Sequence, residues 1–202
     1  MKELYEIMIS SGALKIDTTE YFTFSSGIRS PIYCDTRKLI SFPEYRNRII
    51  TALLERIKDI GAIDSIASVA TGGISWGAWL SDRMNVPFCY VRSEKKSHGT
   101  KNIVEGVLNT SSNILLVEDV VTTGKSLGLA ASQIREIGGE NISSICLFSY
   151  GFRESIELLS GLKINLYPLM DLKNLINQIG DESQKAEIEK WSKNPWENKH
   201  EN

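Results

Sequence analysis

Two adjacent acidic residues followed by a turn rich in hydroxyl groups form the most informative stretch of the sequence. Residues 114–117 are a short apolar run that predicts a buried parallel strand, and it ends in Glu118 and Asp119. Residues 122–126, Thr-Thr-Gly-Lys-Ser, then open a predicted helix, where backbone N–H groups bind phosphate. The two carboxylates cannot bind that phosphate, but they suit sugar hydroxyls or the water shell of Mg²⁺.

Two other interpretations of this stretch are disfavoured. A nucleotide P-loop would need Gly five residues before Gly124, and Asp119 occupies that position. A surface pair of helix-capping carboxylates would not need the hydroxyls and the glycine that follow at once. Ligands of open α/β sheets bind outside the carboxyl ends of the strands, so we expect a binding site here.

The run Glu-Asp-Val-Val-Thr-Thr-Gly-Lys-Ser after an apolar strand resembles the phosphoribosyl-diphosphate-binding motif of type I phosphoribosyltransferases. The resemblance implies that residues 122–126 hold the 5′-phosphate of the sugar. It also implies that Glu118 and Asp119 hold the ribose hydroxyls, and that Asp119 is catalytic and assists a bound metal through water. The residues that this motif assigns to phosphoribosyl diphosphate are Glu118, Asp119, Val120, Val121, Thr122, Thr123, Gly124, Lys125 and Ser126.

A second stretch, residues 90–101, is basic. Five basic or potentially basic side chains lie between two predicted strands, namely Arg92, Lys95, Lys96, His98 and Lys101. Such a run is usually only a solvated surface. Here, with Gly99 in the run, it predicts a mobile cationic loop that stabilises a departing diphosphate.

The pattern Arg92-Ser93-x-x-Lys96-x-His98-Gly99 resembles the catalytic loop of orotate phosphoribosyltransferases. By that resemblance Arg92, Lys96 and His98 contact the diphosphate, and Lys96 and His98 are catalytic. The resemblance also implies a homodimer, in which the loop 93–104 reaches the neighbouring active site. Some members carry a second Lys where this chain has Ser93, so the contact of that lysine is missing or supplied differently.

Residues 22–35 resemble the family's hood over orotate. Ser26, Gly27 and Tyr33 are the candidate orotate contacts there, whereas Ser25 stands where some relatives carry Lys. Thr122 and Arg153 complete the candidate set, although Arg153 is about one residue out of the family's register. The alternative interpretation is an edge hairpin without a ligand.

The sequence Ala-Thr-Gly-Gly-Ile-Ser at 70–75 predicts a strand-to-helix turn that exposes N–H groups to an anion. In the family this loop holds the diphosphate. Thr71, Gly72 and Gly73 are therefore added to the candidate contacts with phosphoribosyl diphosphate.

Strand and helix patterns alternate after residue 43, which predicts βαβ units and an α/β fold. Pro43 marks the start of a helix with apolar residues every three or four positions. The resemblance implies the type I phosphoribosyltransferase fold, a mostly parallel central sheet flanked by helices with a small N-terminal hood. We divide the chain into a hood segment (1–42), a phosphoribosyltransferase core (43–170) and a helical C-terminal tail (171–202) whose last residues are frayed.

Composition narrows the function classes. The 202 residues carry a net charge of −2, which argues against a general nucleic-acid binder. The sequence has no run of 18 apolar residues, and its first residues are acidic, so we expect no membrane partner and a cytoplasmic location. Three scattered cysteines and two histidines predict packed, reduced thiols rather than a zinc site.

These observations lead to one interpretation with two alternatives. The resemblance implies transfer of a phosphoribosyl group from 5-phospho-α-D-ribose 1-diphosphate to orotate, with Mg²⁺ as cofactor, in pyrimidine biosynthesis. One alternative is a type I phosphoribosyltransferase for another nucleobase, which the hood and the basic loop argue against. The other is a non-catalytic regulator that senses phosphoribosyl diphosphate and binds nucleic acid, which the net charge and the lack of an added domain disfavour.

Overall fold

A six-stranded sheet lies at the centre of the molecule. The computed structural model describes residues 2–24, 26–93 and 103–197. The strand order is β10-β9-β8-β5-β6-β7, and every neighbouring pair is parallel except β6 with β7. The mostly parallel sheet expected from the sequence is thus confirmed. Its strands are β5 (Ser65–Val69), β6 (Phe88–Val91), β7 (Val104–Gly106), β8 (Ile114–Val121), β9 (Ile142–Ser149) and β10 (Leu166–Asp171).

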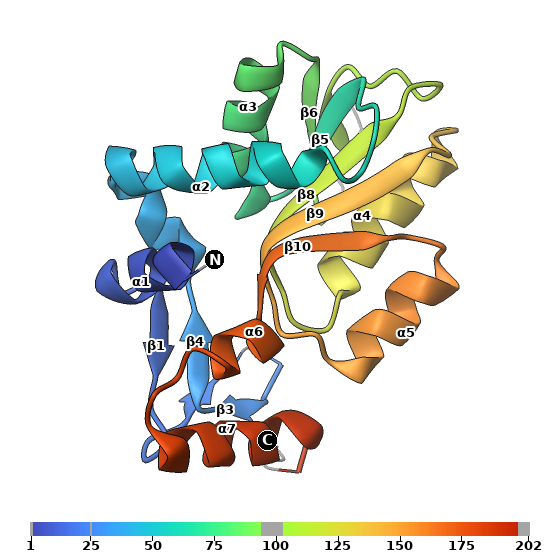
Figure 1. Cartoon of the computed structure of the whole chain (residues 1–202). Helices are drawn as coiled ribbons and strands as arrows, with labels where there is room; N and C mark the ends of the chain where they lie inside the picture. The colour runs from blue at the N-terminus through green and yellow to red at the C-terminus, as the bar shows by residue number, and fades with distance from the viewer. Residues whose placement is uncertain (1, 25, 94–102, 198–202) are drawn as a thin grey trace.

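Helices cover both faces of this sheet (Figure 1). α2 (Pro43–Ile57) and α3 (Gly73–Met84) contribute to one buried apolar cluster, and α4 (Lys125–Glu136) and α5 (Arg153–Gly161) to another. Pro43 is at the start of α2, and the helix buries Ile49, Leu53 and Ile57 along one side. The spacing of these residues predicted that helix from the sequence.

The hood consists of short elements whose strands lie outside the central sheet. They are α1 (Lys2–Ser10), β1 (Leu14–Ile16), β2 (Phe22–Thr23), β3 (Arg29–Ser30), β4 (Ile32–Cys34) and the 3₁₀-helix η1 (Thr36–Ser41). β1 pairs with β4, and β2 pairs with β3, both antiparallel. Each pair is an isolated two-stranded ribbon, so the hood depends on its neighbours for stability.

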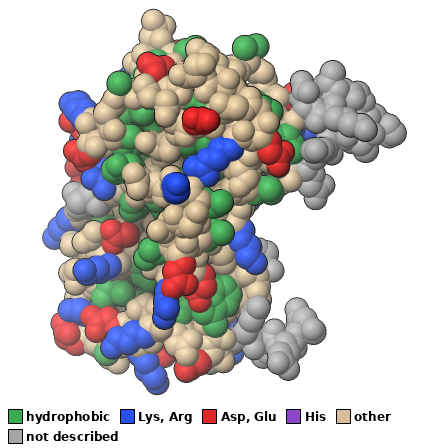
Figure 2. Space-filling view, turned by 90° about the vertical axis from the view of Figure 1, so that its right-hand side faces the viewer, with side chains coloured by type: hydrophobic (Ala, Val, Ile, Leu, Met, Phe, Trp, Pro, Cys, Tyr) green, Lys and Arg blue, Asp and Glu red, His purple; other side chains and the backbone are tan. Residues whose placement is uncertain are grey.

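The tail contains two helices, α6 (Leu172–Ile176) and α7 (Glu182–Lys193). Asp171 and Asp181 precede them, and their carboxylates accept hydrogen bonds from the backbone N–H groups of Asn174 and Gln184. α7 lies beside the hood strand β3 in Figure 1, far in sequence from it. Figure 2 shows the molecule hollowed between the core above and the hood and tail below.

The three cysteines are free thiols, and Cys89 and Cys146 are buried, as expected from the sequence. Within the described ranges, no helix is long and apolar enough to cross a membrane.

Candidate functional site

The acidic pair lies within β8 rather than at its end. The sequence indicated a strand that ends in Glu118 and Asp119, but β8 continues to Val121. Glu118, Val120 and Val121 pair in register with residues of β9, and Val121 is buried. The expected strand end is therefore corrected. The apolar Val120 and Val121 extend the ladder, so both carboxylates are held on regular backbone.

Glu118 is the more buried of the two acids. Glu118 is only 6% exposed, and its Oε1 accepts a hydrogen bond from the backbone N–H of Asp119 at 3.1 Å. Burial, and next the charge of Asp119, raise the pKa of the Glu118 carboxyl well above its usual range. Burial within the core therefore opposes ionisation of Glu118.

Asp119 joins three segments of the chain. The Thr36 hydroxyl of η1 donates to Asp119 Oδ2 at 3.3 Å. A Cβ atom built at Gly72 would overlap the Asp119 carboxylate, so only glycine leaves room for it there. The structure thus brings the predicted diphosphate loop and the predicted ribose pair together. A Cβ at Gly73 would come within 2.5 Å of the Val117 carbonyl oxygen, so this second glycine lets α3 begin close to β8.

The hydroxyl-rich turn lies at the start of α4. Thr122 and Thr123 form the bend after β8, and Gly124 takes φ +76° as the residue before the helix. Lys125 and Ser126 are exposed in the first turn of α4. The N–H groups of this first turn have no partner within the helix, and the helix dipole adds positive potential. The turn therefore has the geometry for an anion.

Three of the predicted phosphate contacts, Arg92, Lys125 and Ser126, line one hollow of about 150 Å³. Ala70, which precedes the predicted diphosphate contacts 71–73, also lines it. Arg92 follows β6, and its guanidinium is 3.4 Å from a carboxylate oxygen of Glu105 on β7. Lys96 and His98 lie outside the described residues, so the structure reports only the two ends of their loop.

Three of the candidate base contacts, Ser26, Gly27 and Tyr33, lie in the hood. Gly27 has φ +80° in the turn between β2 and β3, and Ser26 beside it is exposed. The Tyr33 ring is half-buried, with its centroid 5.6 Å from that of Phe22 and 6.4 Å from that of Phe24. The Tyr33 ring therefore lies among other aromatic side chains, and it has the flat surface that one wall of a base site requires.

Two of the contacts between the hood and the carboxyl ends of the core strands lie close to the candidate site. The Tyr150 hydroxyl, just beyond β9, donates to the Ile32 carbonyl at 3.2 Å. The other is the bond from Thr36 to Asp119. Neither Tyr150 nor Thr36 was predicted to have a role from the sequence. A Tyr at the end of a strand does not indicate which residue it will contact, and the partner of Tyr150 lies 118 residues away. Thr36 directly follows the hood pattern 22–35, so its position in the sequence could have marked it as a site residue.

Arg153 is placed differently from the other candidates. Its side chain is 87% exposed at the start of α5, and its Nε is 2.6 Å from a carboxylate oxygen of Glu157 one helical turn on. This placement on the outer surface of α5 gives the orotate assignment of Arg153 no support.

Within the described parts of the chain, no three His, Cys, Asp or Glu side chains come together to hold a metal ion. The acidic pair supplies two carboxyl groups at most, which suits a Mg²⁺ ion that keeps its waters and binds mainly to substrate phosphates.

Comparison with known proteins decides the family. The model of the phosphoribosyl transferase domain matches residues 43–156. An orotate phosphoribosyltransferase from Bacillus cytotoxicus is 36% identical over 201 residues, covering 96% of this chain and 95% of that protein. The chain belongs to the orotate phosphoribosyltransferase family.

Other family members agree in sequence and fold. The orotate phosphoribosyltransferase of Coxiella burnetii is 38% identical over 199 residues, and the match covers 96% of this chain and 95% of that protein. The crystal structure of orotate phosphoribosyltransferase from Aeropyrum pernix matches with a TM-score of 0.76 and 31% identity, over 88% of this chain and 98% of that one. The family's type I phosphoribosyltransferase fold is the α/β architecture described above.

Proposed function

We propose that this chain transfers the 5-phosphoribosyl group of 5-phospho-α-D-ribose 1-diphosphate to a ring nitrogen of orotate. The products are orotidine 5′-phosphate and diphosphate, in a step of de novo pyrimidine biosynthesis in the cytoplasm. The observation that carries the proposal is the position of Asp119, between the Gly72 loop and Thr36 of the hood. A sugar held at Asp119 would have phosphate-binding backbone on one side and the base-binding segment on the other.

The chain's own residues act by position and charge. Residues 122–126 hold the 5′-phosphate at the start of α4, and the loop 71–73 holds the diphosphate. Asp119 binds the ribose hydroxyls, so that the anomeric carbon is fixed between the leaving diphosphate and the attacking nitrogen. Bond breaking places positive charge on the ribosyl ring and negative charge on the diphosphate, and no protein nucleophile is needed.

Three side chains stabilise the negative charge on the diphosphate. Arg92, Lys96 and His98 supply cations to the leaving group, with Lys96 and His98 delivered by the loop of a neighbouring subunit in a homodimer. Mg²⁺ on the diphosphate would neutralise part of the same charge. When Mg²⁺ is bound, Asp119 would hold it through a water molecule, since the acidic pair offers too few carboxylates for an all-protein site.

A spectrophotometric assay of orotate consumption tests the proposal. Purified protein with orotate, phosphoribosyl diphosphate and Mg²⁺ should consume orotate, and EDTA should stop the reaction. Parallel assays offer hypoxanthine, guanine, xanthine or uracil in place of orotate. Turnover of one of these bases in preference to orotate would contradict the proposal, as would no turnover of any base.

The assignment of the loop has its own test. Lys96→Ala should lower kcat about 100-fold while the KM for orotate changes little, because the partner charge develops only in the transition state. An unchanged kcat would remove Lys96 from this role. Sedimentation of the active protein tests the homodimer, and a fully active monomer would refute the shared site.

A further inference from the structure

The hairpin that carries Gly27 is too short to fix its own position. β2 and β3 contribute two residue pairs, Phe22 with Ser30 and Thr23 with Arg29. An isolated two-stranded hairpin is marginally stable at best, even when it is longer than this. Ile28 and Ser30 are fully buried and anchor one strand. The rest of the hairpin, including the exposed Ser26, must be positioned by other contacts.

Two hydrogen bonds from α7 reach both arms of this hairpin. The Tyr21 hydroxyl, just before β2, donates to Glu187 Oε1 at 2.6 Å. The indole Nε1 of Trp191 donates to the Arg29 carbonyl in β3 at 2.8 Å. The two bonds join residues separated by 166 and 162 positions in the chain. The C-terminal helix therefore holds the segment that is expected to bind the base.

Trp191 also contacts the core. It is only 4% exposed, and its ring centroid lies 6.4 Å from that of Tyr150 and 5.6 Å from that of Phe152, with both ring pairs edge to face. Tyr150 in turn donates its hydroxyl hydrogen bond to Ile32 of the hood. One indole thus connects the tail, the hood hairpin and the segment that follows β9.

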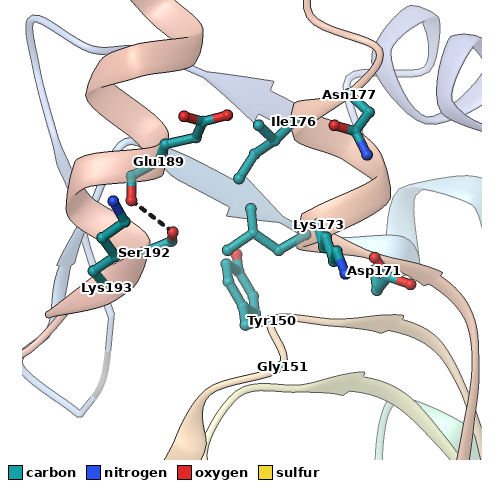
Figure 3. A pocket seen from close by; sticks show the side chains of 10 residues that line it. Tyr150, Gly151, Asp171, Lys173, Ile176, Asn177, Glu189, Ser192 and Lys193 are labelled. Carbon is teal, nitrogen blue, oxygen red and sulfur yellow. Dashed lines mark hydrogen bonds between the residues drawn. The ribbon is translucent and has the colours of Figure 1, made fainter.

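Near Trp191 the tail and core are separated by open space. A hollow of about 500 Å³ lies between α6, α7 and the end of β9, with Tyr150 and Gly151 among its lining residues. Figure 3 shows Glu189, Ser192 and Lys193 of α7 on one side of this hollow, and Lys173 and Ile176 of α6 on the other, with Asn177 just after α6. Because that space is not filled by side chains, the anchoring of α7 depends on the few residues that do make contact, and Trp191 is one of them.

We propose that Trp191 is a positioning residue for the base site, which fixes the Gly27 hairpin through its hydrogen bond to the Arg29 carbonyl. This inference rests on the proposed function, because it assumes that the hairpin binds the base. A residue with this role affects the binding of orotate and leaves the phosphoribosyl diphosphate site and the chemical step unchanged. A merely structural residue would lower stability without separating the two substrates.

The test compares Trp191→Phe with Ser192→Ala. Trp191→Phe keeps an aromatic ring and removes the N–H donor. Ser192→Ala removes the neighbouring 2.8 Å hydrogen bond to the Glu189 carbonyl, which stays within α7 and is drawn in Figure 3. One lost hydrogen bond corresponds to about a two- to tenfold change in an equilibrium constant.

We expect Trp191→Phe to raise the KM for orotate about two- to tenfold. The KM for phosphoribosyl diphosphate and kcat should stay within about twofold of wild type, because the change does not reach those sites. Ser192→Ala should leave all three constants unchanged. An unchanged orotate KM in folded Trp191→Phe overturns the proposal, and so does an equal rise in both KM values. If the wild-type protein does not consume orotate, the proposed function fails before this comparison is made.

The second hydrogen bond gives an independent test if Trp191→Phe does not fold. Tyr21→Phe removes the donor to Glu187, whereas Glu187→Gln keeps an acceptor at the same position. Tyr21→Phe should raise the orotate KM selectively, and Glu187→Gln should stay closer to wild type. An orotate KM that stays at the wild-type value in Tyr21→Phe refutes the positioning of the hairpin by α7.

Discussion

The two halves of the candidate site are built in different ways. The proposed phosphoribosyl half comprises residues 71–73, 118–119 and 122–126, which lie in the regular core beside parallel strands. The proposed base half comprises a hairpin of two residue pairs, the Tyr33 aromatic group and the distant helix α7. Sites on sheet and helix ends are more rigid than sites on loops, because their backbone is fixed by many ladder hydrogen bonds.

The difference indicates which part of the site recognises the phosphoribosyl group and which part recognises the base. Charge and phosphate geometry are the same for every phosphoribosyl transfer, so a rigid local motif suffices. The base must be distinguished from other flat rings, and the contacts that do so are assembled from distant segments. Substitutions in the first half should therefore act on the chemical step, and substitutions in the second half on the KM for orotate.

The largest effect is expected at Asp119. Asp119→Asn removes a negative charge beside the developing ribosyl cation while it keeps the shape of the side chain, and kcat should fall about 100-fold. Thermal unfolding should show an intact fold. Steady-state kinetics for both substrates measure the effect, and wild-type kcat would show that the phosphoribosyl half has been misassigned.

A smaller effect is expected at Gly72. The added methyl group of Gly72→Ala must displace the Asp119 carboxylate, so kcat should fall about tenfold while the protein still folds. Gly161→Ala is the matched control, since a Cβ there meets nothing within 4 Å. Equal kinetic constants for Gly72→Ala and Gly161→Ala would show that Gly72 does not set the position of Asp119. They would also weaken the expected difference between the two halves of the site.

The base half predicts a different pattern. Tyr33→Leu removes the aromatic wall, and the KM for orotate should rise about tenfold, which is within the range for stacking of one base. The KM for phosphoribosyl diphosphate should not change. Phe42→Leu, at an exposed aromatic residue before α2, serves as the control. If Tyr33→Leu lowers kcat and leaves the orotate KM alone, the two halves are not separable.

The smallest effect concerns stability rather than rate. The pKa of Glu118 is raised in the folded protein, chiefly by burial, so folding favours the protonated acid. Its contribution to stability is therefore fully present below the unfolded pKa and is lost as pH rises. Glu118→Gln should unfold at a higher temperature than wild type at pH 8, by about 2–4 °C for each kcal/mol of burial cost removed.

At pH 4 the same two proteins should unfold at nearly equal temperatures. Glu140→Gln, at an exposed carboxylate, controls for the loss of a charge alone. A gain from Glu118→Gln that is as large at pH 4 as at pH 8 would contradict the burial argument.

The sequence predicted the core well because its signals are local. An apolar strand, two acids and a Thr-Thr-Gly-Lys-Ser turn are consecutive, and each follows from backbone geometry over a few residues. The exact end of β8 was not predictable in this way, since pairing of Val120 and Val121 with β9 extends the strand.

The base half was predicted only in part. Gly27 and Tyr33 were found by pattern, but Thr36, Tyr150 and Trp191 act through partners 83, 118 and 162 residues away. No spacing within the sequence reports such a pairing. Arg153 shows the same limit, because its side chain pairs with Glu157 in its own helix.

The bonds between α7 and the hood hairpin also have a consequence for the order of events during synthesis. The hairpin is synthesised before α7, because Glu187 and Trp191 are added more than 160 residues after their hairpin partners. A domain folds as its residues emerge, and contacts between distant residues require closure of a long loop. The phosphoribosyl half can therefore form before α7 is synthesised, and we expect base recognition to be complete only once α7 has joined the hairpin.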